Sequence, residues 1–463
     1  MERSQTLHQS IATDYTPSSR PMPWIKSPLN EVVGRSSPDS SERNEPYNLV
    51  PATPLFREHH EANSIELFSD LFFVANLATF TANHDIENAQ ALGSYIGFFT
   101  LLWFTWLQTS LYDVRFSTDS ICSRIFYALS FGVMIGFAVA GPLFDTGKEG
   151  YVPVCFRSLS LILMASRFFL VMQYAMVLWY VKEYPKTIVP LALIMAMLFT
   201  SAMVFLGLFF AFTDQGSNHA YIGWYIVCFI EAIVVVIVSS IWRVLSFKHT
   251  HLVERIGLLT LIIMGEGIIG LTKSVAKILT KSGDITSSDL GTIVAGGFLV
   301  FFLWVLYFDQ IDPDRFGTIG VQIWTLLHYP LHVAILLTVE GSSKFILWWT
   351  LVERYLHANR LPKALNLDIS TCMAIPDTQN ETSALPYEAL RPIQPPEAID
   401  LFVTVFYFFF IGAGCVLITL GVLYWCVLTF FVVIVADNYL VWHINRNTSP
   451  RTPHFRSETE SSV

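Results

Sequence analysis

Charged side chains inside long apolar segments are the residues of this sequence most able to do chemistry. One such segment is residues 251–271, HLVERIGLLTLIIMGEGIIGL, which is long and apolar enough to cross a bilayer as a helix. Glu266 lies roughly 18 Å along that helix from Glu254, which is near mid-bilayer if Glu254 is at the interface. Arg255 precedes Glu266 by about three turns, so the two side chains share a helix face. A carboxylate at that depth is costly in lipid, so we predict that Glu266 faces protein or water and has a partner.

Other apolar segments also carry ionisable side chains. Glu66 and Asp70 are four residues apart near the start of the first apolar segment, so they lie on one helix face. Acidic groups are expected near a helix N-terminus, because the helix dipole favours them. Arg167 lies near the middle of a later segment and needs an anion, for which the candidates are Asp70, Glu231 and Glu266.

Two histidines form a further candidate pair. His328 and His332 lie on either side of Pro330 and share a helix face, so they could join a proton path. They could instead bind a metal ion with Glu340 or Glu266, but the spacing specifies no third ligand. Hydrogen-bonded structural histidines are the more common case, and we predict no metal ion and no cofactor.

The composition indicates the class of protein. Of 463 residues, 53% are hydrophobic and 14% are charged, whereas a soluble domain carries about 25% charged residues. The apolar residues form blocks of bilayer-crossing length, and the short alternating segments of a β-barrel are absent. We therefore predict an all-α, polytopic helical membrane protein. No basic patch indicates nucleic-acid binding, and the six cysteines include no CxxC pair that would indicate a disulfide framework or a zinc site.

The apolar blocks predict about twelve transmembrane helices. They lie at residues 65–81, 95–111, 121–141, 154–180, 188–212, 220–244, 251–271, 291–308, 321–339 and 344–357, with two more within 399–442. The segment at 344–357 is short, so a re-entrant or interfacial position is an alternative for it.

Polar segments divide the chain into parts. We predict a disordered cytosolic N-terminal tail (1–63), a first transmembrane half (64–250), a second transmembrane half (251–443) and a C-terminal tail (444–463). Within the second half, the Pro-rich polar residues 358–397 are predicted to be a disordered loop.

The two halves show signs of an internal repeat. FTLLW at residues 99–103 resembles FFLW at residues 301–304, and Glu66 and Glu254 each open an apolar segment. The offset is about six helices, which is an even number, so the halves would have the same orientation across the membrane. Transporters commonly follow this plan, with the binding site between the halves.

Lysine and arginine residues predict the orientation. They gather in the loops after the even-numbered segments and in the C-terminal tail, whereas residues 84–92 and 213–219 contain none. This pattern places both termini in the cytosol. The loop with Lys273, Lys277 and Lys281 disagrees with it. The sequence indicates neither which cell membrane the protein occupies nor its oligomeric state, and it leaves a homo-oligomer open.

Two of the charged segments resemble a known family. ELFSDLFFV at residues 66–74 is similar to the ELFFDLVFV signature of the low temperature requirement protein A (LtrA) family. HLVERIGLLTLIIMGE at residues 251–266 is similar to the HxxERxGLxxIIxLGE segment of that family. With further matches at 304–309 and 328–341, the resemblance covers most of residues 65–341.

The resemblance implies a multi-pass membrane protein and implies no particular activity. Ser69 stands where the family usually has Phe, and Gly267 stands where it often has Ser. The second departure weakens any role for a hydroxyl group beside Glu266. The long N-terminal tail and the polar loop at 358–397 are additions that are typical of a eukaryotic, fungal-type member.

We expect the intramembrane charges to carry the function. The leading hypothesis is a secondary transporter or an ion- or proton-conducting protein, whose partners are the lipid bilayer and a small solute that the sequence does not identify. The alternative is a structural or sensory protein whose charges only specify helix packing. We do not expect an enzyme, because the sequence contains no GxSxG, HExxH or phosphate-binding loop. The candidate pathway residues are Glu66, Asp70, Arg167, Glu231, Glu254, Arg255, Glu266, His328 and His332.

Access to water separates the two hypotheses. A polar cavity that reaches Glu266 would support transport, whereas a dry cluster with every charge paired would support packing.

Overall fold

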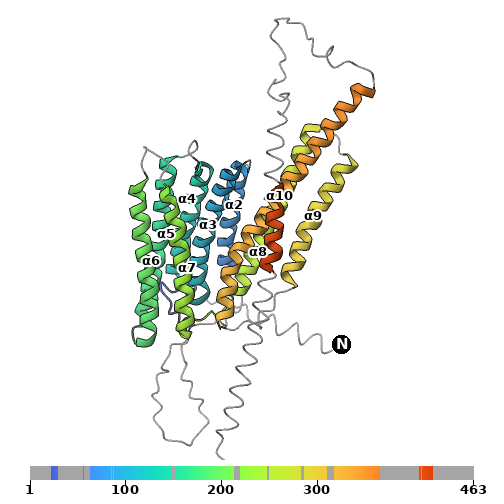
Figure 1. The fold of residues 1–463 in the computed structure, drawn as a ribbon. Coiled ribbons are helices and arrows are strands. Elements are labelled where there is room, and N and C mark those ends of the chain that lie inside the picture. The colour runs from blue at the N-terminus through green and yellow to red at the C-terminus, as the bar shows by residue number, and fades with distance from the viewer. Residues whose placement is uncertain are drawn as a thin grey trace, which may run out of the picture.

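The protein is a bundle of long helices (Figure 1). The computed structural model describes residues 22–29, 56, 63–84, 86, 88–147, 152–212, 219–247, 250–282, 286–309, 318–364, 406–407 and 409–420. Within these residues, extended pairing is limited to one isolated bridge between Leu29 and Phe56. The predicted all-α class is confirmed.

The helices follow the order of the apolar segments. Their bounds are α2 (Ser64–Asn83), α3 (Ala89–Phe116), α4 (Ile121–Ala140), α5 (Pro153–Tyr180), α6 (Pro185–Ala211), α7 (Ile222–Ile241), α8 (Leu252–Ser282), α9 (Ser287–Phe308) and α10 (Thr318–Ala364). Three connections contain short 3₁₀ turns, η1 (Gly141–Leu143), η2 (His219–Tyr221) and η3 (Arg243–Leu245). A further apolar helix covers Phe409–Leu420.

Local sequence explains where several helices begin. The side chains of Asn88 and Ser120 accept hydrogen bonds from the backbone N–H groups three residues further on, and so cap α3 and α4. Thr286 and Asp289 form a reciprocal capping box at the start of α9. Helices α5 and α6 each begin with a proline, whose fixed φ angle suits the first helical position.

Seven helices in the described part of the chain are long and apolar enough to cross a membrane, namely α2, α4, α5, α6, α7, α9 and α10. Helices α3 and α8 are outside this group, so a membrane crossing by the predicted segment 251–271 stays a prediction. Helix α3 is mostly buried by its neighbours, so it needs little lipid-compatible surface. The chain is an integral, multi-pass membrane protein. The total of about twelve spans stays a prediction, since most of residues 399–442 lie outside the described residues.

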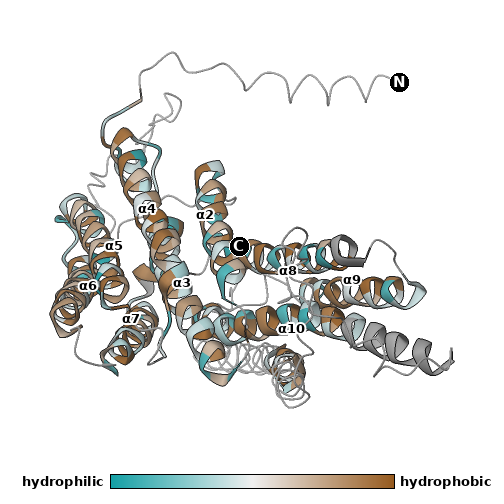
Figure 2. Ribbon diagram, turned by 90° about the horizontal axis from the view of Figure 1, so that it is seen from above, coloured by the Kyte–Doolittle hydropathy of each residue, from teal (hydrophilic) through white to brown (hydrophobic). Residues whose placement is uncertain are grey.

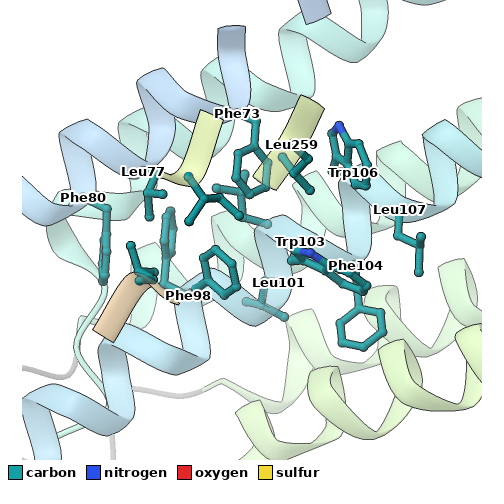
Figure 3. Close-up of a cluster of buried hydrophobic side chains, with 14 of the residues drawn as sticks. Phe73, Leu77, Phe80, Phe98, Leu101, Trp103, Phe104, Trp106, Leu107 and Leu259 are labelled. Carbon is teal, nitrogen blue, oxygen red and sulfur yellow. The ribbon is translucent and has the colours of Figure 1, made fainter. Parts of the chain in front are cut away.

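Helix α3 forms the centre of the bundle. It packs against α2, α5, α7, α8 and α10, and Figure 2 shows it between the α4–α7 group and the α8–α10 group. Figure 3 shows how its aromatic side chains, among them Phe98, Trp103 and Trp106, fill the core together with Phe73 of α2. The indole N–H groups of the two tryptophans bring polar partners into this apolar core, as described below.

The ninth and tenth predicted segments form one helix, so residues 344–357 are not a separate re-entrant or interfacial segment. Helix α10 has 47 residues and continues through Pro330, and at 1.5 Å per residue it measures about 70 Å. The hydrocarbon core is only about 30 Å thick, so a helix of this length extends beyond the membrane, and the charged residues after Lys344 belong to the same helix.

This continuous helix corrects the predicted side of the loop that follows it. Helices α2 and α8 run parallel, because Glu66 contacts His251 and Asp70, four residues after Glu66, contacts Arg255, four residues after His251. Helices α8 and α10 also run parallel, because Thr260 contacts His332 and, further along both helices, Ser274 contacts Ser343. The end of α10 at Ala364 therefore lies at the face opposite the start of α2. The prediction placed the loop beginning at residue 358 on the same face as the N-terminus. The rest of that loop and the C-terminal tail lie outside the described residues.

The predicted internal repeat is not established by the described helices. It pairs α3 with α9, yet α3 is buried over most of its length, whereas α9 exposes Phe298, Phe301 and Phe302. Helices in corresponding positions thus have different surroundings, and the two equivalent halves stay a prediction.

Part of the predicted N-terminal tail lies against the helices. The backbone carbonyl groups of Pro23 and Trp24 accept hydrogen bonds from the N–H groups of Ile121 and Cys122, in the first turn of α4. These N–H groups have no acceptor within their own helix. Residues 22–29 therefore differ from the disordered tail that the composition predicts.

Close packing of α8 on α10 depends on one glycine beside Glu266. A Cβ atom at Gly267 would lie 2.1 Å from Cγ1 and 2.8 Å from Cβ of Val339, whereas one at Gly265 would meet nothing within 4 Å. Of the two glycines that flank Glu266, only Gly267 therefore lies in close contact with a neighbouring helix.

We expect Gly267→Ala to lower the melting temperature of the purified protein, because the added methyl group pushes α8 away from α10. Overpacking of this kind typically costs about 1–3 kcal/mol. Gly265→Ala is the matched control and should leave the melting temperature unchanged or slightly higher, because alanine favours helix over glycine by about 1 kcal/mol. Thermal unfolding in detergent compares the variants, and equal melting temperatures would contradict the close packing.

Candidate functional site

Arg255 on α8 is surrounded by acidic side chains. Its Nη1 atom is 3.3 Å from Oε2 of Glu66, and its Nη2 atom donates a 2.9 Å hydrogen bond to Oδ1 of Asp70. His251, one turn earlier, contacts the same Glu66 oxygen through Nε2 at 3.0 Å, and donates there because a carboxylate accepts. These four residues and Asp113 form what we call the Arg255 cluster.

Asp113 on α3 brings a third carboxylate to the Arg255 cluster. Its Oδ2 atom is 3.9 Å from Nη1 of Arg255. Trp106, also on α3, donates from its indole Nε1 to Oδ1 of Asp70 at 2.8 Å, and its ring centroid is 5.7 Å from the guanidinium carbon of Arg255. The five members of the cluster are each at most 6% exposed.

The Arg255 cluster has a surplus of acid. Three carboxylates face one guanidinium and one imidazole, so the charges balance only when the cluster carries two more protons, either on His251 and one carboxylate or on two carboxylates. An unbalanced buried charge is costly, whereas a bound proton or cation removes the cost. The cluster is therefore built to take up positive charge.

A cleft of about 530 Å³ opens beside the Arg255 cluster. It lies between the start of α2, the end of α3 and the start of α4, and Ser64, Ser117 and Tyr127 are among its lining residues. Tyr127 also interacts with Asp113, so it joins this Tyr127 cleft to the buried acids. The cluster thus lies next to the surface at one end of the bundle.

A second buried charge is fully balanced. Arg167 on α5 donates from Nε and Nη2 to the carboxylate of Glu231 on α7, at distances between 2.9 and 3.1 Å. Its Nη1 atom donates to the hydroxyl groups of Thr105 and Ser166 at 3.1 and 2.9 Å. Both charged side chains are fully buried. Of the three predicted anions, Glu231 is the partner, and a dry, satisfied pair of this kind is typical of helix packing.

His332 on α10 lies in the core between the ends of the bundle. Its Nδ1 atom accepts a 2.9 Å hydrogen bond from Nε1 of Trp103, and its Nε2 atom is 2.7 Å from Oγ1 of Thr260. An indole N–H can only donate, so Nδ1 carries no proton and the imidazole is neutral in this arrangement.

His328 is held in the same manner one turn earlier. Its Nδ1 atom donates to the carbonyl of Trp324 at 2.7 Å, and its Nε2 atom accepts from the hydroxyl of Tyr307 at 2.9 Å. The rings of His328 and His332 are 5.4 Å apart, so the two residues do share a face. Every ring nitrogen of the pair is engaged in a hydrogen bond, which leaves none for a metal ion.

Glu266 lies three turns beyond Arg255 on α8 and is 2% exposed. Neither of its carboxylate oxygens has a hydrogen-bond partner among the described residues. The charged groups that interact with it electrostatically are Lys273 and Glu340. The close partner that the sequence led us to expect is therefore not found, because Arg255 is bound by other acids and Arg167 by Glu231.

A cleft of about 410 Å³ lies one helical turn beyond Glu266. Gly270 lines it and shares the helix face of Glu266, four residues earlier. Thr81 at the end of α2 also lines it, about 25 Å along that helix from Ser64 in the Tyr127 cleft. This Lys273 cleft therefore opens at the opposite end of the bundle. Its lining residues are Thr81, Ala82, Gly270, Lys273, Ser274, Ala276, Lys277, Glu340, Ser343 and Lys344.

Glu254 is not brought to any of these groups. It is exposed on α8, although Arg255 beside it is buried. Adjacent residues on a helix point about 100° apart, so a span that buries one exposes the other. Glu254 is therefore the one residue among the nine candidates that lies outside the buried groups.

Sequence reasoning missed two buried charges at the end of α3. The predicted apolar segment ends at residue 111, so neither Asp113 nor Arg115 is among the candidate residues from the sequence. Helix α3 instead continues to Phe116, and no glycine or proline between Leu111 and Phe116 would have ended it. Arg115 donates to Oγ of Ser239 at 2.9 Å and also to a backbone carbonyl of η3, so it ties the end of α7 to α3.

Comparison with known protein families identifies the chain. Residues 61–436 match the family described as bacterial low temperature requirement A protein (LtrA). The chain belongs to the LtrA family. Comparisons with curated proteins and with solved structures give no match. The LtrA match includes the whole Arg255 cluster, Glu266 and both histidines.

The two LtrA signature segments meet in space. Glu66 and Asp70 come from residues 66–74, and His251 and Arg255 come from residues 251–266. The charged positions by which the sequence resembles the LtrA family thus form one buried ionic contact between α2 and α8.

We expect Glu231→Gln to destabilise the protein strongly, because it leaves Arg167 buried without its anion. Loss of one partner of a buried pair typically costs about 3–5 kcal/mol. The double variant Arg167→Met, Glu231→Leu should recover most of that loss, since neither charge remains. Melting temperatures in detergent test this expectation, and a double variant less stable than both single variants would contradict it.

We expect the Arg255 cluster to tolerate loss of an acid better than loss of its cation. Arg255→Gln leaves three buried carboxylates without a guanidinium, so it should lower the melting temperature markedly at neutral pH. Stability of that variant should rise as the pH falls from about 8 to about 5, because the folded state then binds more protons than the unfolded state. Asp113→Asn removes surplus negative charge and should change stability by no more than about 1 kcal/mol. Melting curves across this pH range measure both, and the reverse ranking would contradict the charge surplus.

Proposed function

We propose that the protein is a secondary transporter that couples solute movement to protons. The observation that carries this proposal is the arrangement along α8. A surplus-acid cluster lies near one end of the helix, and the unpaired Glu266 lies three turns further on. Each site lies beside a cleft, and the two clefts open at opposite ends of the bundle. Ionisable groups inside membrane helices are rare and usually mark a pathway.

Protons are the coupling ion that the chemistry favours. The Arg255 cluster holds more carboxylates than cations, and Glu266 receives no hydrogen bond from a described residue. A proton neutralises a buried carboxylate and removes the cost of its burial. Each acid site can therefore gain a proton from its own cleft and lose it when its surroundings change.

The middle of the bundle supports alternating access rather than a continuous pore. Proton transfer through His332 requires its bond from Trp103 to break, because that bond occupies the nitrogen that must be protonated. Since Trp103 is on α3 and His332 on α10, relative movement of these helices would break it. Transporters of the repeat type work by such rocking of one helix group against another.

A packing role is the second candidate, and one observation favours it. The Arg167–Glu231 pair is balanced, fully buried and hydrogen-bonded, as a purely structural charge pair would be. Packing does not account for Glu266, because a carboxylate that holds helices together needs a partner.

The proposal includes an orientation and no catalytic step. We place the Tyr127 cleft at the cytosolic face, because the distribution of lysine and arginine puts the start of α2 there.

We propose no enzymatic reaction, since the acids of the Arg255 cluster are engaged by Arg255, His251 and Trp106.

A flux assay tests the transport proposal. The full-length protein is reconstituted in vesicles that contain a pH-sensitive dye, and a panel of ions and small solutes is applied under an imposed gradient. We expect native protein to move protons with at least one solute, and Glu266→Gln to lose this flux by about tenfold or more. Glu254→Gln is the matched control, because it removes the same charge from an exposed site on the same helix and should retain native flux.

Two results would contradict the proposal. One is native protein, folded and inserted, that moves no solute and no protons under any gradient. The other is equal flux in the native protein and in Glu266→Gln, which would mean that the buried carboxylate takes no part.

A further inference from the structure

The Lys273 cleft is unusual for its position in the bundle. It gathers three lysines, Lys273, Lys277 and Lys344, with the hydroxyl groups of Ser274 and Ser343, which lie 2.6 Å apart. Its volume of about 410 Å³ falls within the range of about 300–1,000 Å³ that is usual for small-molecule sites. Glu340 lines the cleft as well, so three lysines face one carboxylate, and the size and the excess of positive charge suit a small anion.

Two of these lysines, Lys273 and Lys277, disagree with the charge pattern used to orient the chain. They follow the seventh predicted segment, at the same face as residues 84–92 and 213–219, which contain no lysine or arginine. The end of α10, with Arg360 and Lys363, lies at that face as well, so the two lysines are not isolated positive charges there. Their presence together with Lys344 in one cleft favours recognition of negative charge.

Glu266 makes anion binding dependent on a proton. The titratable or charged groups that interact with it are Lys273 on its own helix, Glu340 on α10 and Tyr95 on α3. Glu340 is itself close to Lys344, with Nζ 4.0 Å from Oε1. As a carboxylate, Glu266 attracts Lys273 and repels an incoming anion, and once protonated it does neither.

We propose that the Lys273 cleft binds a small carboxylate or phosphate-type anion together with a proton on Glu266, so that each promotes binding of the other. This inference rests on the proposed function and names its substrate class, an anion carried with a proton. Linkage requires the effect to be reciprocal, so a bound anion must raise proton affinity by the same factor by which the proton raises anion affinity.

A lipid headgroup offers the same chemistry as a soluble anion, and the cleft favours the soluble one. Its walls come from three helices, α2, α8 and α10, and a buried acid lies one turn behind Gly270. An anionic headgroup at the bilayer surface would need only the exposed lysines and would not respond to protonation of Glu266.

Calorimetry on the full-length protein tests the proposal. Succinate and inorganic phosphate are the probes, titrated into protein in phosphatidylcholine nanodiscs in two buffers with different ionisation enthalpies, which reports the protons taken up. We expect native protein to bind succinate or phosphate with proton uptake, and Glu266→Gln to bind it without uptake. Lys273→Met should weaken binding by about tenfold or more. Lys182→Met, which removes a lysine from the far end of α5, is the matched control and should bind as native.

Each outcome decides one point. Absence of binding by folded native protein at about 1 mM, the upper end of common substrate affinities, would overturn the inference. Equal proton uptake in native protein and Glu266→Gln would overturn it as well. Loss of succinate binding in nanodiscs that contain phosphatidylglycerol would also overturn it, because the lipid headgroup would then be the occupant of the cleft. Proton flux with cations only would overturn the anion assignment and leave the transport proposal standing. Anion binding with proton uptake, but without movement of anions or protons across vesicles, would support the binding site and contradict the transport proposal.

Discussion

One buried guanidinium sets the position of the helices around it. Arg255 contacts acids on α2 and α3 while its own helix, α8, packs along α10. A charge removed from both water and lipid must be matched by groups at fixed distances, and a one-residue shift of any partner helix would turn its acid away. Because apolar packing between membrane helices has weak directional preference, these ionic contacts specify the register that packing alone leaves loose.

The three charged sites differ in how far their charges are satisfied, and this difference separates structure from function. Arg167 and Glu231 balance each other and have all the hydrogen bonds that they need. The Arg255 cluster is bound tightly yet holds more acid than base. Glu266 has neither a close cation nor a hydrogen bond from a described residue. A fold under selection for stability alone has no reason to keep the last two arrangements, because each carries the cost of a buried charge without the compensating contact.

The spacing of residues in the sequence predicts which side chains share a face of one helix. It does not predict which side chains on different helices contact each other. The shared face of Glu66 and Asp70 and the neighbouring rings of His328 and His332 both follow from helical periodicity. The contact between Glu66 and His251 joins residues far apart in the chain, so only the packed bundle reveals it. Asp113 was missed because a charge at the end of an apolar run reads as solvated, while neighbouring helices bury the last turn of α3. The sequence predicts two segments where the structure has the single helix α10. Hydropathy indicates only which residues suit the membrane interior, whereas a helix continues through polar residues as long as its backbone hydrogen bonds are made.

The same helix carries both unbalanced sites, and this has a mechanical consequence. Arg255 and Glu266 are about 16 Å apart along α8. A change of charge at Glu266 can therefore move Arg255 only if α8 moves as a rigid body. Gly267 permits that helix to lie against Val339 of α10, where the contact is too close to be compressed further. Movement of α8 must therefore carry α10 with it or slide along it, and either motion displaces Thr260 or His332 from the bond network that closes the centre. Under the proposed function, protonation at one end and opening of the middle would be coupled through this single packed pair of helices.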